Sequence, residues 1–293
     1  VKQDFTLSDT AANAFSVMLF VWFFVFSIPT GMLMNRIGRK KTVLLSMLVT
    51  LVAMMTPFVA YGKGSMFIAV SLLGIGNTLM QVSLNPLVAN MVAPANQASV
   101  LTLGQFIKAI ASFLGPILAV QAAVHLGDWR YLFVAFAIVN LMALLYLHFT
   151  DIREDEGEKE VSSFSDCLKL LGTGSILLLF IGILMHVGID VGINITAPKL
   201  LQERTGMSLE SAAYATSIYF LFRTAGCLAG TFIMSRYSPV RFFLLSVLII
   251  LAGIAGMLFF KNTILLYICV GLVGFGNSNV FSIIFSGALQ TLP

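Results

Sequence analysis

The chain has 293 residues, of which 58% are hydrophobic and only 10% are charged, and its formal net charge is +4. Its mean hydropathy is +0.96. Soluble domains carry about 25% charged residues because a water-facing surface needs ionic groups. The composition therefore excludes an ordinary soluble protein and indicates an integral membrane protein whose partner is the lipid bilayer.

Continuous apolar runs follow one another along the chain. A membrane-spanning helix needs about 20 mostly apolar residues, whereas a membrane β-strand would alternate apolar and polar residues. The runs therefore predict an all-α membrane protein with about nine transmembrane helices, at 11–34, 42–60, 66–92, 100–124, 130–149, 172–197, 210–233, 242–260 and 264–291.

Positive charge concentrates in the break after the first run, where "NRIGRKK" (35–41) holds four cations. Lys and Arg in short loops stay preferentially on the cytoplasmic side of a membrane. If this break is cytoplasmic, alternate breaks lie on the same side and collect nine bases, against six on the other side. We expect a multi-pass plasma-membrane protein, typical of a bacterial inner membrane. A patch for nucleic acid is not expected, because a tight turn between two spans offers little surface.

The sequence repeats itself at an offset of 200 residues. Met34 and Arg36 match Met234 and Arg236, and "LLGIGN" (72–77) matches "LVGFGN" (272–277). Six predicted helices separate the matching points, so the repeated unit is a six-helix half. We expect an N-terminal half at 1–150, an acidic cytoplasmic linker at 151–170 and a C-terminal half at 171–293. On this interpretation the chain lacks three of twelve helices.

Several segments resemble a known family. "GMLMNRIGRKK" (31–41) resembles the loop signature of the major facilitator superfamily, and "GDWRYLF" (127–133) is similar to its entry into the sixth helix. "GNTLMQVSLNPLV" (76–88), "HVGIDVGINI" (186–195) and "GFGNSNVFSIIFSGAL" (274–289) are similar to helices four, seven and ten of its fucose/galactose/glucose–proton symporter branch. The resemblance implies the major facilitator fold, with two pseudo-symmetric six-helix halves. The chain would then contain helices two to six and seven to ten.

The resemblance implies a gating role for the first loop, and it also has two departures. The loop signature usually has an aspartate where this chain has Asn35. The branch usually has a glutamate for proton-coupled transport at the position of Gln81, and glutamine cannot titrate. Proton coupling would then depend on the missing first helix or work otherwise. The gating residues are Gly31, Asn35, Arg36, Gly38, Arg39 and Lys40.

Polar side chains recur every four residues in some spans and are rare in others. Such residues are costly at membrane depth, so they face a protein interior or a water-filled path. The spans at 42–60, 130–149 and 242–260 have almost no amide or charged residues in their apolar interiors, and Asn140 is the one exception. We expect the other spans to ring a polar cavity with Asn77, Gln81 and Asn85; Gln105, Lys108 and Ser112; His186, Asp190 and Asn194; Tyr219 and Arg223; and Asn277, Asn279, Ser282 and Ser286.

Amide side chains both donate and accept hydrogen bonds, which suits sugar hydroxyls. Asn77 and Asn277, beside paired glycines, alternatively hydrogen-bond neighbouring helices. We expect substrate contacts from Gln81, Asn85, Gln105, Lys108, Asn194, Arg223, Asn277 and Asn279.

Asp190 is the only acid deep within any predicted span, and two roles stay open for it. It either carries a proton or neutralises Lys108 or Arg223 as a structural ion pair. His186, one turn away, either relays protons or makes a hydrogen bond inside the bundle. Lys108 and Arg223 either hold the carboxylate of a sugar acid or exchange as partners of Asp190.

These features favour a monomeric secondary transporter that imports a sugar or a related polyhydroxylated solute by rocker-switch alternating access. H⁺ is the driving ion by resemblance. A carrier of anionic sugar acids and a drug or metabolite exporter of the same fold are alternatives. "GPILAV" (115–120) argues against the exporter, because it lacks two further glycines that antiporters of the superfamily often have.

Other classes of function are disfavoured. The chain has no HExxH, no phosphate-binding loop and no Ser–His–Asp order, so we expect no enzyme. We also expect no cofactor and no metal, because Cys167, Cys227 and Cys269 are far apart in the sequence. A receptor built on a disused transporter fold would gain nothing from polar stripes at membrane depth.

Overall fold

The computed structural model describes residues 5, 9–152, 154, 164–208, 212 and 214–291. The elements of the described residues are helical because backbone groups inside a bilayer must be satisfied within their own segment. Half of the acidic linker at 151–170, including Arg153 and Lys159, lies outside the described residues. The long helices are α1 (Asp9–Ile37), α2 (Arg39–Val59), α3 (Lys63–Asn90), α4 (Gln97–Leu126), α5 (Tyr131–Phe149), α7 (Gly174–Thr205), α9 (Tyr214–Met234), α10 (Pro239–Phe259), α11 (Thr263–Asn277) and α12 (Val280–Thr291).

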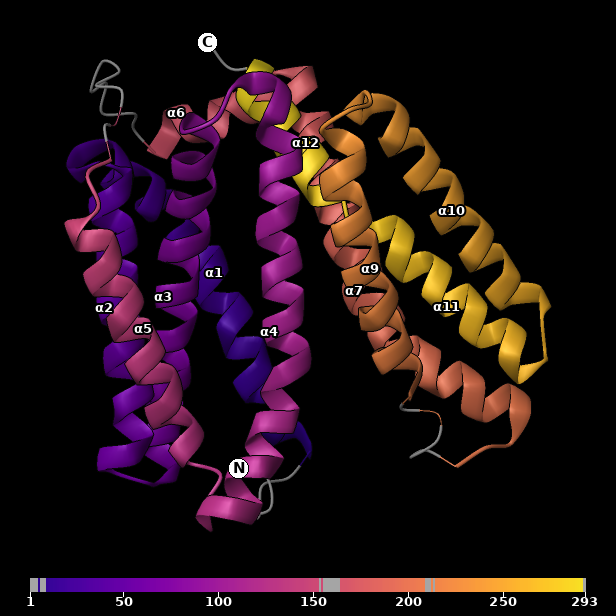
Figure 1. Cartoon of the computed structure of the whole chain (residues 1–293), viewed down its shortest axis with the longest axis horizontal. Helices are drawn as coiled ribbons and strands as arrows, with labels where there is room; N and C mark the ends of the chain where they lie inside the picture. The colour runs from indigo at the N-terminus through magenta and orange to yellow at the C-terminus, as the bar shows by residue number, and fades with distance from the viewer. Residues whose placement is uncertain are drawn as a thin grey trace. The chain divides into compact units, whose positions relative to one another are not determined.

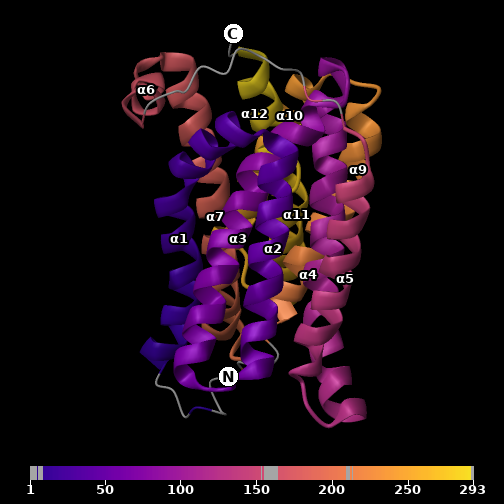
Figure 2. The same cartoon turned by 90° about the vertical axis from the view of Figure 1, so that its left-hand side faces the viewer.

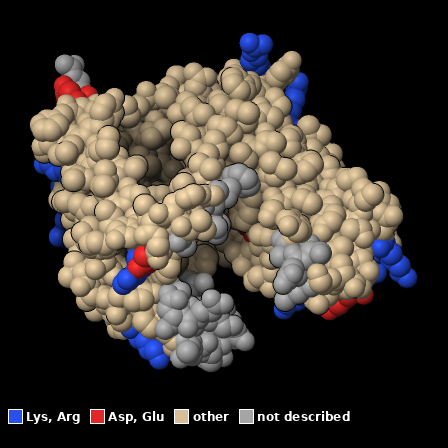
Figure 3. Space-filling model, turned by 60° about the horizontal axis from the view of Figure 1, so that its bottom comes forward, with Lys and Arg blue, Asp and Glu red and all other residues tan. Residues whose placement is uncertain are grey.

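Short helices complete the described chain: η1 (Pro94–Asn96), α6 (Phe164–Lys169) and η2 (Leu170–Gly172). Eight segments of the described residues are long and apolar enough to cross a membrane, with α11 and α12 together counted as one segment, Thr263–Gln290. α4 has 30 residues and sufficient length, although several of its side chains are not described. On the face in Figure 3, residues other than Lys, Arg, Asp and Glu form nearly the whole surface. The chain is therefore an all-helical, multi-pass membrane protein.

Contacts divide the chain into two compact units. Unit 1 comprises Val1–Asn90 and Gly115–Lys169, and unit 2 comprises Met91–Leu114 and Leu170–Pro293. In unit 1, α3 packs against α1 and α2, and α5 packs against α2 (Figures 1 and 2). In unit 2, α11 packs against α9, α10 and α7. The first part of α4 belongs to unit 2, whereas the boundaries expected from the sequence assign it to the N-terminal half.

The 200-residue repeat is visible in the helix boundaries and in the packing. α2 begins at Arg39 and ends at Val59, and α10 begins at Pro239 and ends at Phe259. α3 packs against α1 and α2 in the same way that α11 packs against α9 and α10. The sequence repeat therefore corresponds to a repeated three-helix arrangement, one copy in each unit.

Matched glycines explain why this arrangement recurs. A β-carbon on Gly76 would lie 3.3 Å from the carbonyl oxygen of Ser46, and one on Gly276 would lie 2.7 Å from that of Ser246. Ser46 and Ser246 are themselves 200 residues apart. Small residues allow membrane helices to approach closely, so each glycine sets the contact between its helix and the neighbouring one.

The predicted span at 264–291 is present as Thr263–Gln290, and the helix is interrupted within it. α11 ends at Asn277 and α12 begins at Val280. Asn279 Nδ2 donates to the Gly226 carbonyl at 3.0 Å and to Ser278 Oγ at 2.6 Å. Ser278 Oγ also donates to the Phe275 carbonyl, three residues earlier, at 2.6 Å. Short polar side chains that bond to nearby backbone in this way compete with helical hydrogen bonding. The corresponding residues 77–79 contain leucine in place of the second asparagine, and α3 continues through them.

Aromatic residues join two loops at one end of unit 1. Tyr61, after α2, lies 6.3 Å from the Trp129 ring, and the Arg130 guanidinium lies 4.6 Å from the Tyr61 ring centroid. Asp128 accepts from the Arg130 backbone amide at 2.9 Å and from Arg130 Nε at 2.6 Å. The segment "GDWRYLF" therefore anchors the start of α5 to the α2–α3 loop.

Candidate functional site

The charged centre of unit 2 lies where α7 faces α9. The carboxylate of Asp190 forms an ion pair with the guanidinium of Arg223. The same Asp190 Oδ1 atom accepts a hydrogen bond from the Tyr219 hydroxyl at 2.7 Å. The side chains of Asp190 and Arg223 are 26% and 16% exposed, so the pair is shielded but still reachable by a small solute or by water.

A chain of hydrogen bonds continues from this pair into the buried core. Asn277 Nδ2 donates to the Tyr219 hydroxyl at 3.1 Å, and Asn277 Oδ1 lies 2.8 Å from His186 Nδ1. An amide oxygen can only accept, so His186 Nδ1 is the donor in this arrangement. Arg223, Asp190, Tyr219, Asn277 and His186 therefore form one connected network across α7, α9 and α11, which we call the charge network.

Tyr219 is the central member of the charge network, although the sequence analysis predicted only that it faces the polar cavity. Its side chain is fully buried, and it links the acid on α7 with the amide on α11. The only signal in the sequence is its position one turn before Arg223 on an otherwise apolar span. That spacing does not predict which of several polar side chains Tyr219 contacts.

Two polar residues of α4, Gln105 and Lys108, belong to unit 2, as the charge network does. Lys108 is exposed and Gln105 is half-buried. Ser99, on the first turns of α4, donates to the Thr231 carbonyl of α9 at 2.6 Å. Lys108 interacts electrostatically with both Arg223 and Asp190. The structure therefore brings together three of the ionisable residues predicted at membrane depth.

Amide side chains form a ladder along α3 in unit 1. Gln81 Nε2 donates to Asn77 Oδ1 at 3.2 Å, and Asn85 Nδ2 donates to the Gln81 carbonyl at 3.1 Å. Asn77 is exposed, and Gln81 and Asn85 are half-buried. The remaining donors and acceptors of these three side chains form no hydrogen bond with any other residue in the described part of the chain, so they can bind water or a polar solute.

Three of the predicted contact residues bond to protein groups, and two of them, Asn277 and Asn279, are fully buried. Asn277 and Asn279 are fully buried and bond to protein groups, so they do not line an open surface in this structure. Asn194 Nδ2 donates to the carbonyl of Asp190 in its own helix at 2.7 Å, and its Oδ1 atom has no partner among the described residues. The structure therefore gives Asn277 and Asn279 a role in packing and in orienting other side chains.

Hydrogen bonds of Glu154 and Lys40 join the start of α2, in the predicted gating loop, to the segment after α5, and we call this set of contacts the clasp. Gly38, with a φ of 90°, precedes α2, and the Glu154 carboxylate accepts from the backbone amides of Arg39 and Lys40 at 2.7 Å each. In return, Lys40 Nζ donates to the carbonyl of Thr150 at 2.7 Å, just after α5. An anion at a helix N-terminus and a cation at a C-terminus are both favourable.

Glu154 was not identified from the sequence, because 114 residues separate it from its partner Lys40. Asn35 and Arg36 are exposed. Gly31 is half-buried, and no atom would lie within 4 Å of a β-carbon added there. Within the described chain, the clasp therefore involves Gly38, Arg39 and Lys40 of the predicted gating residues.

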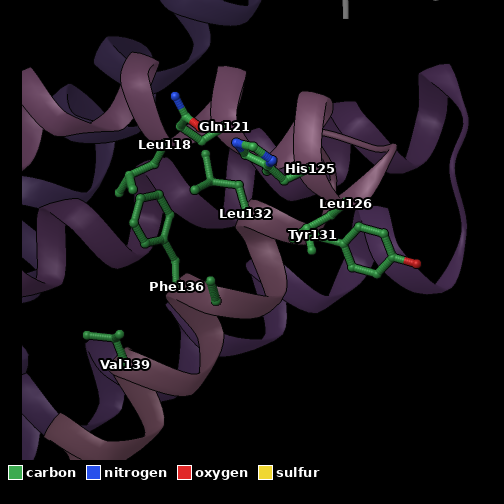
Figure 4. Close-up of a pocket in the computed structure, with 10 residues that line it drawn as sticks. Leu118, Gln121, His125, Leu126, Tyr131, Leu132, Phe136 and Val139 are labelled. Atoms are coloured by element: carbon green, nitrogen blue, oxygen red, sulfur yellow. The ribbon is translucent and has the colours of Figure 1, made fainter.

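A separate pocket of about 410 Å³ lies in unit 1 between the second part of α4 and α5 (Figure 4). Leu118, Leu132 and Phe136 point toward one another there, and Gln121 and His125 are its polar residues. It contains none of the predicted site residues. Its lining is almost wholly apolar and lacks the converging polar groups of a sugar site.

Comparisons with known proteins agree with this architecture. The Major Facilitator Superfamily matches residues 1–293. A glucose/galactose transporter of Brucella abortus is 27% identical over an alignment of 258 residues, and the match covers 80% of this chain and 60% of that protein. A hexuronate transporter of Bacillus subtilis is 24% identical over 244 residues, covering 80% of this chain and 57% of that protein. The chain thus spans about 60% of the length of these curated relatives.

A solved structure has the same fold. The fucose:proton symporter FucP of E. coli superimposes with a TM-score of 0.77 at 15% identity, over 97% of this chain and 83% of that one. Repeated helical units with polar residues at membrane depth are typical of multi-pass membrane transporters. The chain belongs to the Major Facilitator Superfamily, as its loop signature predicts, and not to a family of enzymes.

Proposed function

We propose that this protein is a secondary active transporter that takes up a sugar or a related polyhydroxylated solute together with H⁺. The observation that carries the proposal is the partly exposed Asp190 carboxylate, held by Arg223 and Tyr219 within two largely apolar helices. An acid at membrane depth marks an ion or proton path by default. The names of the Brucella relative and of FucP support sugar as the solute class.

The amide ladder of α3 would supply contacts with solute hydroxyls, with Gln81 and Asn85 as its main members. Because Gln81 cannot titrate, the proton would be carried by Asp190, and His186 would complete the charge network without carrying it. The two halves would move by a rocker switch, opening the polar faces first to one side of the membrane and then to the other. The protein would act as a monomer in a bacterial inner membrane.

The test is uptake into proteoliposomes that contain the full-length protein. Labelled glucose, galactose and fucose should accumulate under an imposed inward proton gradient, and a protonophore should abolish accumulation. Gln81→Ala should weaken apparent affinity by about tenfold, the equivalent of one hydrogen bond of about 1–1.5 kcal/mol. Binding without flux would contradict transport and favour a receptor.

A further inference from the structure

Helix register places Lys108 and Arg223 at the same depth in unit 2. α4 and α9 run in opposite directions (Figure 1), and they are joined by the hydrogen bond from Ser99 to the Thr231 carbonyl. Lys108 follows Ser99 by nine residues, and Arg223 precedes Thr231 by eight. At a rise of about 1.5 Å per residue, both cations lie roughly 12–14 Å from that bond, on the same side of it.

The packing of α4 supports this register. Ala98 is buried in one cluster with Met234, Phe242 and Ile283 of the same unit. Thr102 and Ala109 are also buried, so one face of the first part of α4 is held in the unit. Lys108, next to Ala109, is exposed at the margin of this face. Its position therefore follows from packing as well as from the single hydrogen bond.

The two cations are not matched by equal negative charge. Asp190 is already engaged by Arg223 and Tyr219. The ammonium group of Lys108 forms no hydrogen bond or ion pair with any other residue that the structure describes, although its charge interacts with both members of the Asp190–Arg223 pair. The three formal charges therefore leave one positive charge uncompensated at membrane depth, where unpaired charge is costly.

We propose that Lys108 and Arg223 form a subsite for the carboxylate of an acidic sugar, so that the transported solute is a uronate. The guanidinium of Arg223 has five N–H donors in a planar fork, and Lys108 adds three donors on a flexible stem. A carboxylate bound by both cations would neutralise the excess charge. This inference rests on the proposed transport function and narrows its substrate class.

A neutral sugar would leave the excess charge in place. It has no carboxylate, so Lys108 would keep its charge without a partner. Charge-assisted hydrogen bonds are roughly twice as strong as neutral ones, so the carboxylate distinguishes the two classes of solute. The subsite therefore predicts selectivity between molecules that differ only at C6, such as glucuronate and glucose, or galacturonate and galactose.

The experiment uses these two matched pairs with the full-length protein. Binding is measured as the shift in thermal unfolding of the purified protein, and transport as uptake into proteoliposomes. We expect at least one uronate to bind about tenfold or more tightly than its neutral counterpart, as one charge-assisted interaction implies. Lys108→Gln should remove this preference, and Lys108→Arg should retain most of it. Lys199→Gln, which removes an exposed lysine of α7, is the control and should change the binding of neither solute.

The outcomes separate this subsite from the transport proposal. Uptake of neutral sugars without binding of either uronate would overturn the subsite and leave transport standing. Uronate binding that depends on Lys108, without any flux, would support the subsite and contradict transport. If Lys108→Gln weakens the binding of a uronate and of its neutral counterpart equally, the subsite is overturned. That result would indicate that Lys108 instead exchanges with Arg223 as the partner of Asp190.

Discussion

Asp190 on α7 and Arg223 on α9, 33 residues apart in the chain, form an ion pair within unit 2. Tyr219, one turn before Arg223, bonds to the same carboxylate oxygen. The Asp190 carboxylate therefore accepts hydrogen bonds from two side chains of one neighbouring helix, α9. A change in its charge would alter the contact between α7 and α9. In a transporter, this relationship would couple protonation to helix movement.

Asp190→Asn should abolish accumulation driven by a proton gradient, while solute exchange without a gradient should persist. An amide keeps the shape of the side chain but cannot carry the proton. Counterflow and gradient-driven uptake in proteoliposomes distinguish the two activities. Asp166→Asn, which removes an exposed acid paired with Lys169, is the control. Gradient-driven uptake at the normal level in Asp190→Asn would exclude Asp190 as the proton carrier.

Tyr219→Phe should destabilise the protein by about 1–3 kcal/mol, because it leaves buried polar partners without their hydrogen bonds. The lost hydroxyl donates to Asp190 and accepts from Asn277. Thermal unfolding in detergent measures the effect. Tyr214→Phe on the same helix is the matched control, since Tyr214 is 66% exposed. Equal unfolding temperatures for the two variants would show that the hydroxyl bridge contributes little.

Gly276→Ala should destabilise unit 2 by about 1–3 kcal/mol, the usual cost of overpacking a close contact. The added methyl group would meet the Ser246 carbonyl oxygen at 2.7 Å and would push α11 away from α10. Gly188→Ala in α7 is the control, because no atom lies within 4 Å of its added carbon. That variant should be neutral or slightly more stable. The idea fails if Gly276→Ala unfolds at the wild-type temperature.

Glu154→Gln should destabilise unit 1 by about 1 kcal/mol, because a neutral amide with one acceptor replaces a carboxylate with two at a helix N-terminus. The affected bonds are those to the backbone amides of Arg39 and Lys40. Hydrogen exchange of these two amides is the direct measurement and should become faster. Glu203→Gln, at an exposed site of α7, should leave their exchange unchanged. Unaltered exchange in Glu154→Gln would argue against the clasp.

The Asp128–Arg130 contact should make a small, pH-dependent contribution to stability. Hydrogen bonds from Arg130 lower the pKa of Asp128. Because the folded-state pKa is below the unfolded one, the contribution is present above the ordinary aspartate pKa of about 3.9 and disappears as the pH falls through the lowered value. Asp128→Asn should thus lower the unfolding temperature at neutral pH and not in acid. Asp151→Asn controls for net charge, and a pH-independent difference would contradict this assignment.

The sequence by itself determined the class of the protein and the course of its helices. Hydropathy and turn residues are local properties, so the spans, the repeat and the polar stripes could be predicted from them. The repeat even predicts packing, since Gly76 and Gly276 contact serines that are also 200 residues apart. The break after Asn277 also has a local signal, the three polar residues 277–279, although continuous hydropathy concealed it.

Only the tertiary structure decided which polar groups meet. Periodicity places Asp190 on one face of its helix, but the rotation and depth of α9 determine that Arg223 is its partner and that Tyr219 completes the contact. The same applies to Glu154, whose partners lie more than a hundred residues away in the chain. Side-chain pairing depends on the relative register of separate helices, and that register is set by packing across the whole unit.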